Sequence, residues 1–124
     1  MTRTMVVDDS RAMRMILGRA LRDAGFEVLE ASSGREALER LEQEGPSFRL
    51  VLVDWNMPGL TGLEFVEQVR RQPAWNGVRL LMVTTETGVD QITRALTAGA
   101  DEYVMKPFAK EALTDKLRLL GLIE

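Results

Sequence analysis

The feature that most constrains this chain is the place where each of its short apolar runs ends. Four runs stop at polar side chains: Met5–Val7 at Asp8 and Asp9, Leu50–Val53 at Asp54, Leu80–Val83 at Thr84, and Tyr103–Met105 at Lys106. In an open parallel sheet the carboxyl ends of the strands share one edge, and such folds bind their ligands there. We therefore expect three carboxylates, a hydroxyl and an ammonium group to converge on one small cleft.

Amphipathic helical patterns separate these runs. The runs themselves are apolar at successive positions, as in strands that are covered on both faces. A weaker strand covers residues 27–31, and Ser33, three residues before Glu36, has the spacing of a helix capping box. The expected buried helix positions are Met13, Ile16, Leu17, Ala20, Leu21 and Ala24; Ala37, Leu38 and Leu41; Leu63, Val66 and Val69; Val89, Ile92, Ala95 and Leu96; and Leu113, Leu117 and Leu120. Five alternations of strand and helix predict a single doubly wound α/β domain, although periodicity does not give the strand order.

Composition narrows the functional classes. The chain has 124 residues, 45% apolar and 28% charged, with a net charge of −3. This length and pattern predict one domain over residues 1–124, without an output domain. The chain lacks cysteine and histidine, which excludes thiol and imidazole chemistry on its own side chains. We expect no nucleic-acid partner, and the absence of a long apolar segment leads us to expect a cytoplasmic protein without membrane insertion.

The expected cleft suits phosphoryl transfer. Clustered carboxylates repel one another unless a cation lies among them, and oxygen ligands favour Mg²⁺. Asp54 is the candidate nucleophile, because a carboxylate can accept a phosphoryl group covalently. Asp9 and Asp54, supported by Asp8, would hold the metal. Lys106 and Thr84 would neutralise or bind the remaining phosphoryl oxygens.

Several motifs in order resemble those of the receiver domain of bacterial two-component response regulators. They are Val6–Ser10, Asp54–Pro58 with Gly62, Val83–Thr84, Gly99–Ala100 and Tyr103–Phe108. The resemblance covers essentially the whole chain, and it is strongest with single-domain members that act in chemotaxis. It implies a flavodoxin-like sheet of order 2-1-3-4-5 and a Mg²⁺ ligand set that adds the backbone carbonyl of Asn56. It also implies phosphorylation of Asp54 by a partner histidine kinase.

The resemblance further implies a switch. The Thr84 hydroxyl would move toward the phosphoryl group, and the Tyr103 ring would fill the vacated space. The face made by the fourth helix, fifth strand and fifth helix would then change shape for a downstream protein target. Asn56 and Glu86 would tune dephosphorylation, and the peptide bond before Pro107 would be cis. Thr85 departs from the small residue that is frequent in the family at its position.

Other interpretations stay open at this point. Asp8 and Asp9 can be a turn and helix cap, and Tyr103 can be an ordinary half-buried aromatic on an edge strand. The chain can be a phosphorelay intermediate or a receiver fold that is never phosphorylated. A flavodoxin-like FMN protein is disfavoured because Asp8 and Asp9 occupy the loop that would bind phosphate. We expect a monomeric regulatory protein, not an enzyme, that supports only its own phosphorylation and autodephosphorylation.

Overall fold

Five parallel strands form one sheet in the computed structural model, which describes residues 2–85, 89–106 and 109–124. The strands are β1 (Arg3–Val7), β2 (Glu27–Ala31), β3 (Phe48–Asp54), β4 (Arg79–Thr84) and β5 (Glu102–Met105). Their order is β2-β1-β3-β4-β5, and all four neighbouring pairs are parallel. The predicted fold class and the strand order implied by the resemblance are both confirmed.

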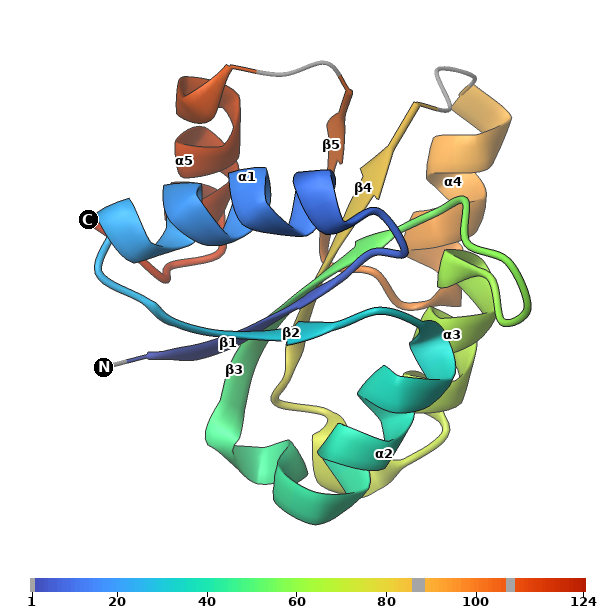
Figure 1. Cartoon of the computed structure of the whole chain (residues 1–124). Helices are drawn as coiled ribbons and strands as arrows, with labels where there is room; N and C mark the ends of the chain where they lie inside the picture. The colour runs from blue at the N-terminus through green and yellow to red at the C-terminus, as the bar shows by residue number, and fades with distance from the viewer. Residues whose placement is uncertain (1, 86–88, 107–108) are drawn as a thin grey trace.

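Helices cover both faces of this sheet (Figure 1). They are α1 (Arg11–Asp23), α2 (Gly34–Glu44), α3 (Gly62–Arg70), α4 (Val89–Ala98) and α5 (Lys110–Leu119). Two short 3₁₀ turns, Gly45–Ser47 and Pro73–Trp75, precede β3 and β4. Helices α1 and α5 lie on one side of the sheet, and α2, α3 and α4 lie on the other.

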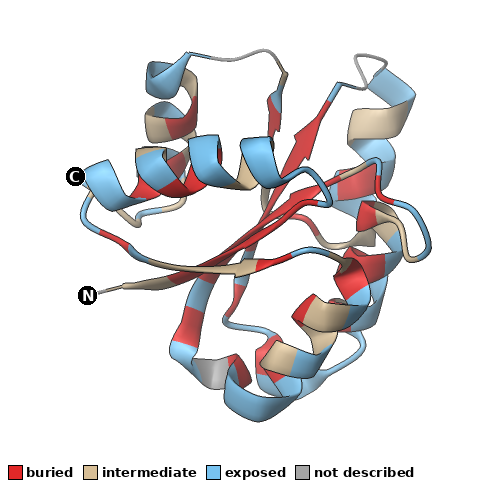
Figure 2. Ribbon diagram, in the orientation of Figure 1, coloured by how far each residue is buried: buried red, intermediate tan, exposed pale blue. Residues whose placement is uncertain are grey.

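Two apolar clusters result, one on each face of the sheet. Alternate strand residues point to opposite faces: Met82 belongs to the cluster under α2, α3 and α4, whereas Val83 belongs to the cluster under α1 and α5. The central strands are buried almost throughout (Figure 2). This double covering explains why their sequences are apolar without alternation. None of the described helices is long and apolar enough to cross a membrane.

The helix starts agree with the local capping chemistry. The Ser33 side chain accepts a hydrogen bond from the backbone N–H of Glu36, as the spacing predicts. Thr61 and Glu64 form a reciprocal capping box at the start of α3. Ser10 caps α1 by accepting from the N–H of Met13, so the alternative in which Asp8 or Asp9 is the cap is wrong.

Two of the predicted apolar stripes are only partly buried. Ile16 on α1 is exposed, and on α4 Val89 and Leu96 are 77% and 42% exposed. Ala95 is the α4 residue that is fully buried. Helix periodicity identifies the helix, but it does not tell which edge of a wide apolar stripe faces solvent.

Candidate functional site

The predicted site residues lie at the carboxyl edge of the sheet. Asp8 follows β1, and Asp54 and Thr84 are the last residues of β3 and β4. All three side chains are buried, whereas Asp9 is exposed. Lys106 follows β5 and is partly buried. The structure therefore brings together the residues that the strand ends predicted.

The Lys106 ammonium group lies close to two carboxylates. Its Nζ donates a hydrogen bond of 3.1 Å to Oδ1 of Asp54 and lies 3.6 Å from Oδ2 of Asp8. Its backbone N–H donates to the carbonyl oxygen of Thr84 over 2.7 Å, which fixes the start of this loop beside β4. One ammonium group thus contacts both the candidate nucleophile and its acidic neighbour.

Asp8 accepts hydrogen bonds at both its side chain and its backbone carbonyl. Its Oδ1 accepts a hydrogen bond of 2.9 Å from the backbone N–H of Ser10. Its carbonyl oxygen accepts from Nη1 of Arg14 on α1, and Nε of that arginine pairs with Glu30 on β2. The sequence analysis missed Arg14, because nothing in its position along α1 distinguishes it from the exposed arginines of the same helix.

The donor set fits a divalent cation. Asp8, Asp9 and Asp54 each offer a carboxylate oxygen, and the three oxygens lie within 4.8 Å of one another. Oδ2 of Asp8 is buried and has no hydrogen-bond partner among the described residues, since Lys106 Nζ lies 3.6 Å from it. A buried carboxylate oxygen that accepts no hydrogen bond can take a metal ion as its partner. The site can therefore hold a hard metal ion.

Burial raises the pKa of Asp54 above the ordinary aspartate value, which disfavours its charged form. The hydrogen bond and charge of Lys106 oppose this effect, the charge of Asp8 adds to it, and a backbone hydrogen bond from Asn56 opposes it further. The direction shows that Lys106 does not fully offset the burial of Asp54, to which the charge of Asp8 adds. An additional positive charge would complete the site.

The rim of the site carries Asn56 and Thr85. The Asn56 side-chain amide donates a long hydrogen bond of 3.5 Å to the Thr85 hydroxyl, which links the segments after β3 and β4. Both side chains are exposed. Glu86 and Pro107, predicted as a dephosphorylation-tuning residue and as a cis-peptide candidate, lie outside the described residues.

Tyr103 lies on β5, which pairs with β4, and β4 in turn pairs with the strand β3 that ends at Asp54. It is on edge strand β5, is partly buried, and packs against the cluster that contains Met82. The structural alternative of a half-buried edge aromatic describes this position correctly. The role of Tyr103 in a switch stays a prediction.

Gly62 packs closely against the backbone of Asp54 and Trp55. The motif included this glycine, but the sequence did not reveal this packing. A Cβ added there would run into the carbonyl oxygen of Asp54 and lie 2.8 Å from Cα of Trp55. The Gly62 N–H also donates to the carbonyl oxygen of Trp55. A glycine at the start of a helix that follows an acidic strand end can indicate that the two backbones approach too closely for a side chain.

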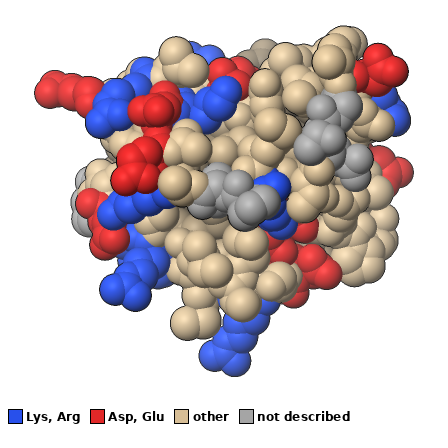
Figure 3. Space-filling model, turned by 90° about the horizontal axis from the view of Figure 1, so that it is seen from above, with Lys and Arg blue, Asp and Glu red and all other residues tan. Residues whose placement is uncertain are grey.

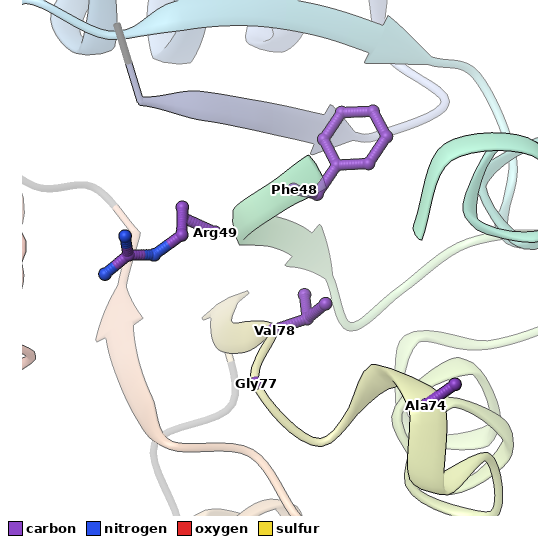
Figure 4. A pocket seen from close by; sticks show the side chains of 5 residues that line it. All are labelled: Phe48, Arg49, Ala74, Gly77 and Val78. Atoms are coloured by element: carbon purple, nitrogen blue, oxygen red, sulfur yellow. The ribbon is translucent and has the colours of Figure 1, made fainter. Parts of the chain in front are cut away.

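The charged side chains on this side of the molecule are mixed in sign. Seen from above, acidic and basic groups are interspersed around a largely uncharged surface (Figure 3). A separate hollow of about 410 Å³ lies at the other end of the sheet, where β3 and β4 begin. Phe48, Arg49, Ala74, Gly77 and Val78 line it (Figure 4), and it contains none of the acidic residues of the site.

An acidic cluster with one lysine, at the carboxyl edge of a 2-1-3-4-5 sheet, is the arrangement that the motifs predicted for a phospho-receiver. Residues 4–118 match the family model described as the response regulator receiver domain. The chain belongs to the response regulator receiver domain family. This assignment also decides against the flavodoxin-like FMN protein.

Curated relatives have similar length and sequence. Chemotaxis protein CheY1 of Helicobacter pylori is 39% identical over 117 residues, which cover 94% of each chain. Chemotaxis protein CheY of Pseudomonas aeruginosa is 40% identical over 114 residues, covering 91% of this chain and 90% of that protein. Among solved structures, the chemotaxis response regulator CheY4 of Vibrio cholerae has a TM-score of 0.89 and 38% identity, covering 97% of this chain and 98% of that one. The chain is therefore a CheY-like signalling domain and not a classical enzyme.

Proposed function

We propose that this protein is a phosphorylation-dependent signalling switch that accepts a phosphoryl group on Asp54. The observation that carries the proposal is the contact of Lys106 Nζ with Asp54 Oδ1, 3.1 Å apart, inside a group of three carboxylates. A nucleophilic carboxylate needs nearby positive charge, since the incoming phosphoryl group is itself anionic. The ammonium group supplies this charge beside the attacking carboxylate.

The transfer is an exchange of one bond for another. An Asp54 oxygen attacks the phosphorus atom, an Asp54 O–P bond forms, and the bond to the donor breaks with its electron pair leaving on the donor. With a partner histidine kinase, that bond is the P–N bond of phosphohistidine. Lys106 stabilises the charge on one phosphoryl oxygen, and the Thr84 hydroxyl donates a hydrogen bond to a second one. The product is an aspartyl phosphate.

Mg²⁺ is the proposed cofactor. Asp8, Asp9, Asp54 and the backbone carbonyl of Asn56 would hold it, with Asp8 acting partly through water. When bound, the ion neutralises charge on the phosphoryl group. These oxygen ligands suit Mg²⁺, which keeps several waters when it binds to protein, so that Asp8 would contact it partly through water.

The direct test is phosphate incorporation from acetyl phosphate in the presence of Mg²⁺. We expect wild-type protein to be labelled and Asp54→Asn to stay unlabelled, because an amide is a poor nucleophile. Asp115→Asn, which changes an exposed carboxylate on α5, is the matched control and should label as wild type does. Absence of labelling in wild type would favour a receiver fold that is never phosphorylated, and labelling of Asp54→Asn would refute the acceptor.

We propose chemotaxis as the pathway, with a downstream protein bound at the face of α4, β5 and α5. The support is the set of relatives named as chemotaxis proteins. Deleting the gene should change the turning frequency of swimming cells, and the Asp54→Asn gene should not restore it. Normal turning in the deletion strain would point to another pathway, such as a phosphorelay that passes the phosphoryl group onward.

We propose that the phosphorylated form is short-lived and that Asn56 and Glu86 control its hydrolysis. A water must approach in line with the Asp54–phosphorus bond. The exposed Asn56 amide, two residues after the acceptor, contacts the Thr85 hydroxyl and would orient this water. Asn56→Met should prolong the phosphorylated form without loss of Mg²⁺ binding. The decay of the Trp55 fluorescence signal after donor removal measures it, and unchanged or faster decay would exclude Asn56 from this role.

A further inference from the structure

Lys116 on α5 forms a joint contact with two consecutive residues of β5. Its Nζ lies 4.5 Å from the centre of the Tyr103 ring, over the face of that ring. The same Nζ donates a hydrogen bond of 3.0 Å to Oε1 of Glu102. This carboxylate oxygen also accepts from the backbone N–H of Tyr103 over 3.1 Å. One oxygen therefore fixes both the backbone of Tyr103 and the cation above its ring.

The place of these residues in the fold makes the contact possible. β5 is an edge strand, and α5 packs on the sheet face that is opposite to the one where Tyr103 meets Met82. Lys116 reaches around this edge from α5. The contact thus joins α5 to a ring that belongs to the cluster under α2, α3 and α4.

Partial burial separates this contact from ordinary surface ion pairs. The Lys116 and Glu102 side chains are 25% and 20% exposed, whereas Lys110 and Asp23, another α5 pair, are 53% and 52% exposed. Exposed pairs contribute little because water screens them. A cation over an aromatic face gains strength as water is removed from it.

We propose that Lys116, held by Glu102, is a positioning residue that clamps the Tyr103 ring in its place and opposes the ring movement of the switch. The inference rests on the proposed function together with the switch that the family resemblance implies, in which the Tyr103 ring would move toward Thr84 after Asp54 is phosphorylated. A ring that moves toward Thr84 would leave its position under the ammonium group, and the cation–π contact would then be lost in the switched state. The clamp therefore sets how much of the protein occupies that state before and after phosphorylation.

The chain has one tyrosine, so ring-¹³C-labelled tyrosine gives NMR signals of Tyr103 alone without altering the charge distribution of the ring. We compare wild type, Lys116→Met, Lys116→Arg and, as the matched control on the same helix, Lys110→Met. Methionine keeps an apolar stem and removes the charge. Arginine keeps a cation that can lie over the ring.

In unphosphorylated protein we expect Lys116→Met to shift the Tyr103 ring signals toward their positions in phosphorylated wild type. The fraction in the switched state should rise about fivefold, as loss of a partly desolvated cation–π contact implies. Lys116→Arg should restore the wild-type positions, and Lys110→Met should leave them unchanged. Coincident spectra for Lys116→Met and wild type would overturn the clamp, as would an equal shift in Lys110→Met.

A second measurement separates the clamp from the function on which it rests. At equal phosphorylation of Asp54, measured on gels that retard phosphoprotein, Lys116→Met should show a larger switched fraction than wild type. An equal or smaller fraction would overturn the opposing role. If acetyl phosphate labels no residue, the proposed function fails. In that case coincident ring signals of Lys116→Met and wild type would still overturn the contact of Lys116 with the ring, and a shift that is absent in Lys116→Arg and in Lys110→Met would support it.

Discussion

At the scale of single residues, the site has more negative than positive charge. Lys106 approaches both Asp54 and Asp8, but Asp9 at the rim adds a third carboxylate within 4.8 Å. Burial is the main cause of the raised pKa of Asp54, and the neighbouring Asp8 adds to it against the opposing Lys106. This excess of negative charge supports the proposal that the site takes a cation, beside which the proposed phosphoryl group would bind.

The raised pKa of Asp54 makes stability depend on pH. A carboxyl group with a raised folded pKa contributes stability at low pH, and this contribution is lost as pH rises from the unfolded pKa through the folded one. The amide of an asparagine imitates the protonated carboxyl group, so Asp54→Asn should melt a few degrees above wild type at neutral pH without divalent cations. The difference should shrink as pH falls through the raised folded pKa and should be lost once pH is below the ordinary aspartate pKa of about 3.9. Thermal unfolding across this range checks it, and a lower melting temperature for Asp54→Asn at neutral pH would contradict it.

Asp9 offers a separate prediction, because it is the exposed member of the acidic group. Asp9→Ala should weaken Mg²⁺ binding at least about tenfold, since a site with few carboxylates loses a large share of its ligands. The fold should be unaffected. Trp55 adjoins Asp54, so a fluorescence titration with Mg²⁺ measures the midpoint. Asp115→Ala is the control, and an unchanged midpoint in Asp9→Ala would remove this residue from the ligand set.

At the scale of elements, the strand ends and the Ser33 cap were predictable, and the connections and the cap at Ser10 were not. The β2 bounds and the cap at Ser33 depend on local chemistry that the sequence displays. The two 3₁₀ turns before β3 and β4 depend on tertiary packing, such as the approach of Gly45 to the Trp75 ring. The exposure of Val89 likewise depends on how α4 is rotated against the sheet. Local sequence does not encode that rotation.

The same division holds for the candidate site. The convergence of Asp8, Asp54, Thr84 and Lys106 was predictable, because parallel strands must end at one edge. The contacts of Arg14 with Asp8, and of Lys116 with Tyr103, were not. Each contact connects separate elements of the fold. The sequence does not distinguish a partly buried arginine or lysine from an exposed one. Such contacts require the packed structure.

The junction of β3 and α3 provides the prediction at this scale. Gly62→Ala should destabilise the fold by roughly 1–3 kcal/mol, because the new methyl group meets the backbone of Asp54 and Trp55. It should also weaken Mg²⁺ binding by displacing Asp54. Gly77→Ala is the matched control, since a Cβ there meets nothing within 4 Å. Denaturant unfolding and the fluorescence titration measure both effects, and equal stability of the two variants would contradict the proposed close approach.

At the scale of the whole molecule, the layered fold separates two tasks. The apolar clusters on both faces of the sheet supply stability, and they leave the carboxyl edge free to hold mutually repelling groups. The buried strands that end at this edge keep Asp8 and Asp54 close together in spite of their repulsion. The stability of the core offsets this repulsion, and a bound cation would relieve it.

Mg²⁺ should therefore stabilise the entire domain. A ligand that binds only the folded state adds RT ln(1 + [L]/Kd), which is about 2.7 kcal/mol at a hundredfold excess over Kd. Because a domain of this size unfolds as one unit, that gain should raise the melting temperature at neutral pH by roughly 10 °C. Asp9→Ala should show a much smaller increase at the same Mg²⁺ concentration, while K⁺ at equal ionic strength should have little effect on either protein. A wild-type melting temperature that is indifferent to millimolar Mg²⁺ would mean that these carboxylates, although clustered, do not form a metal site.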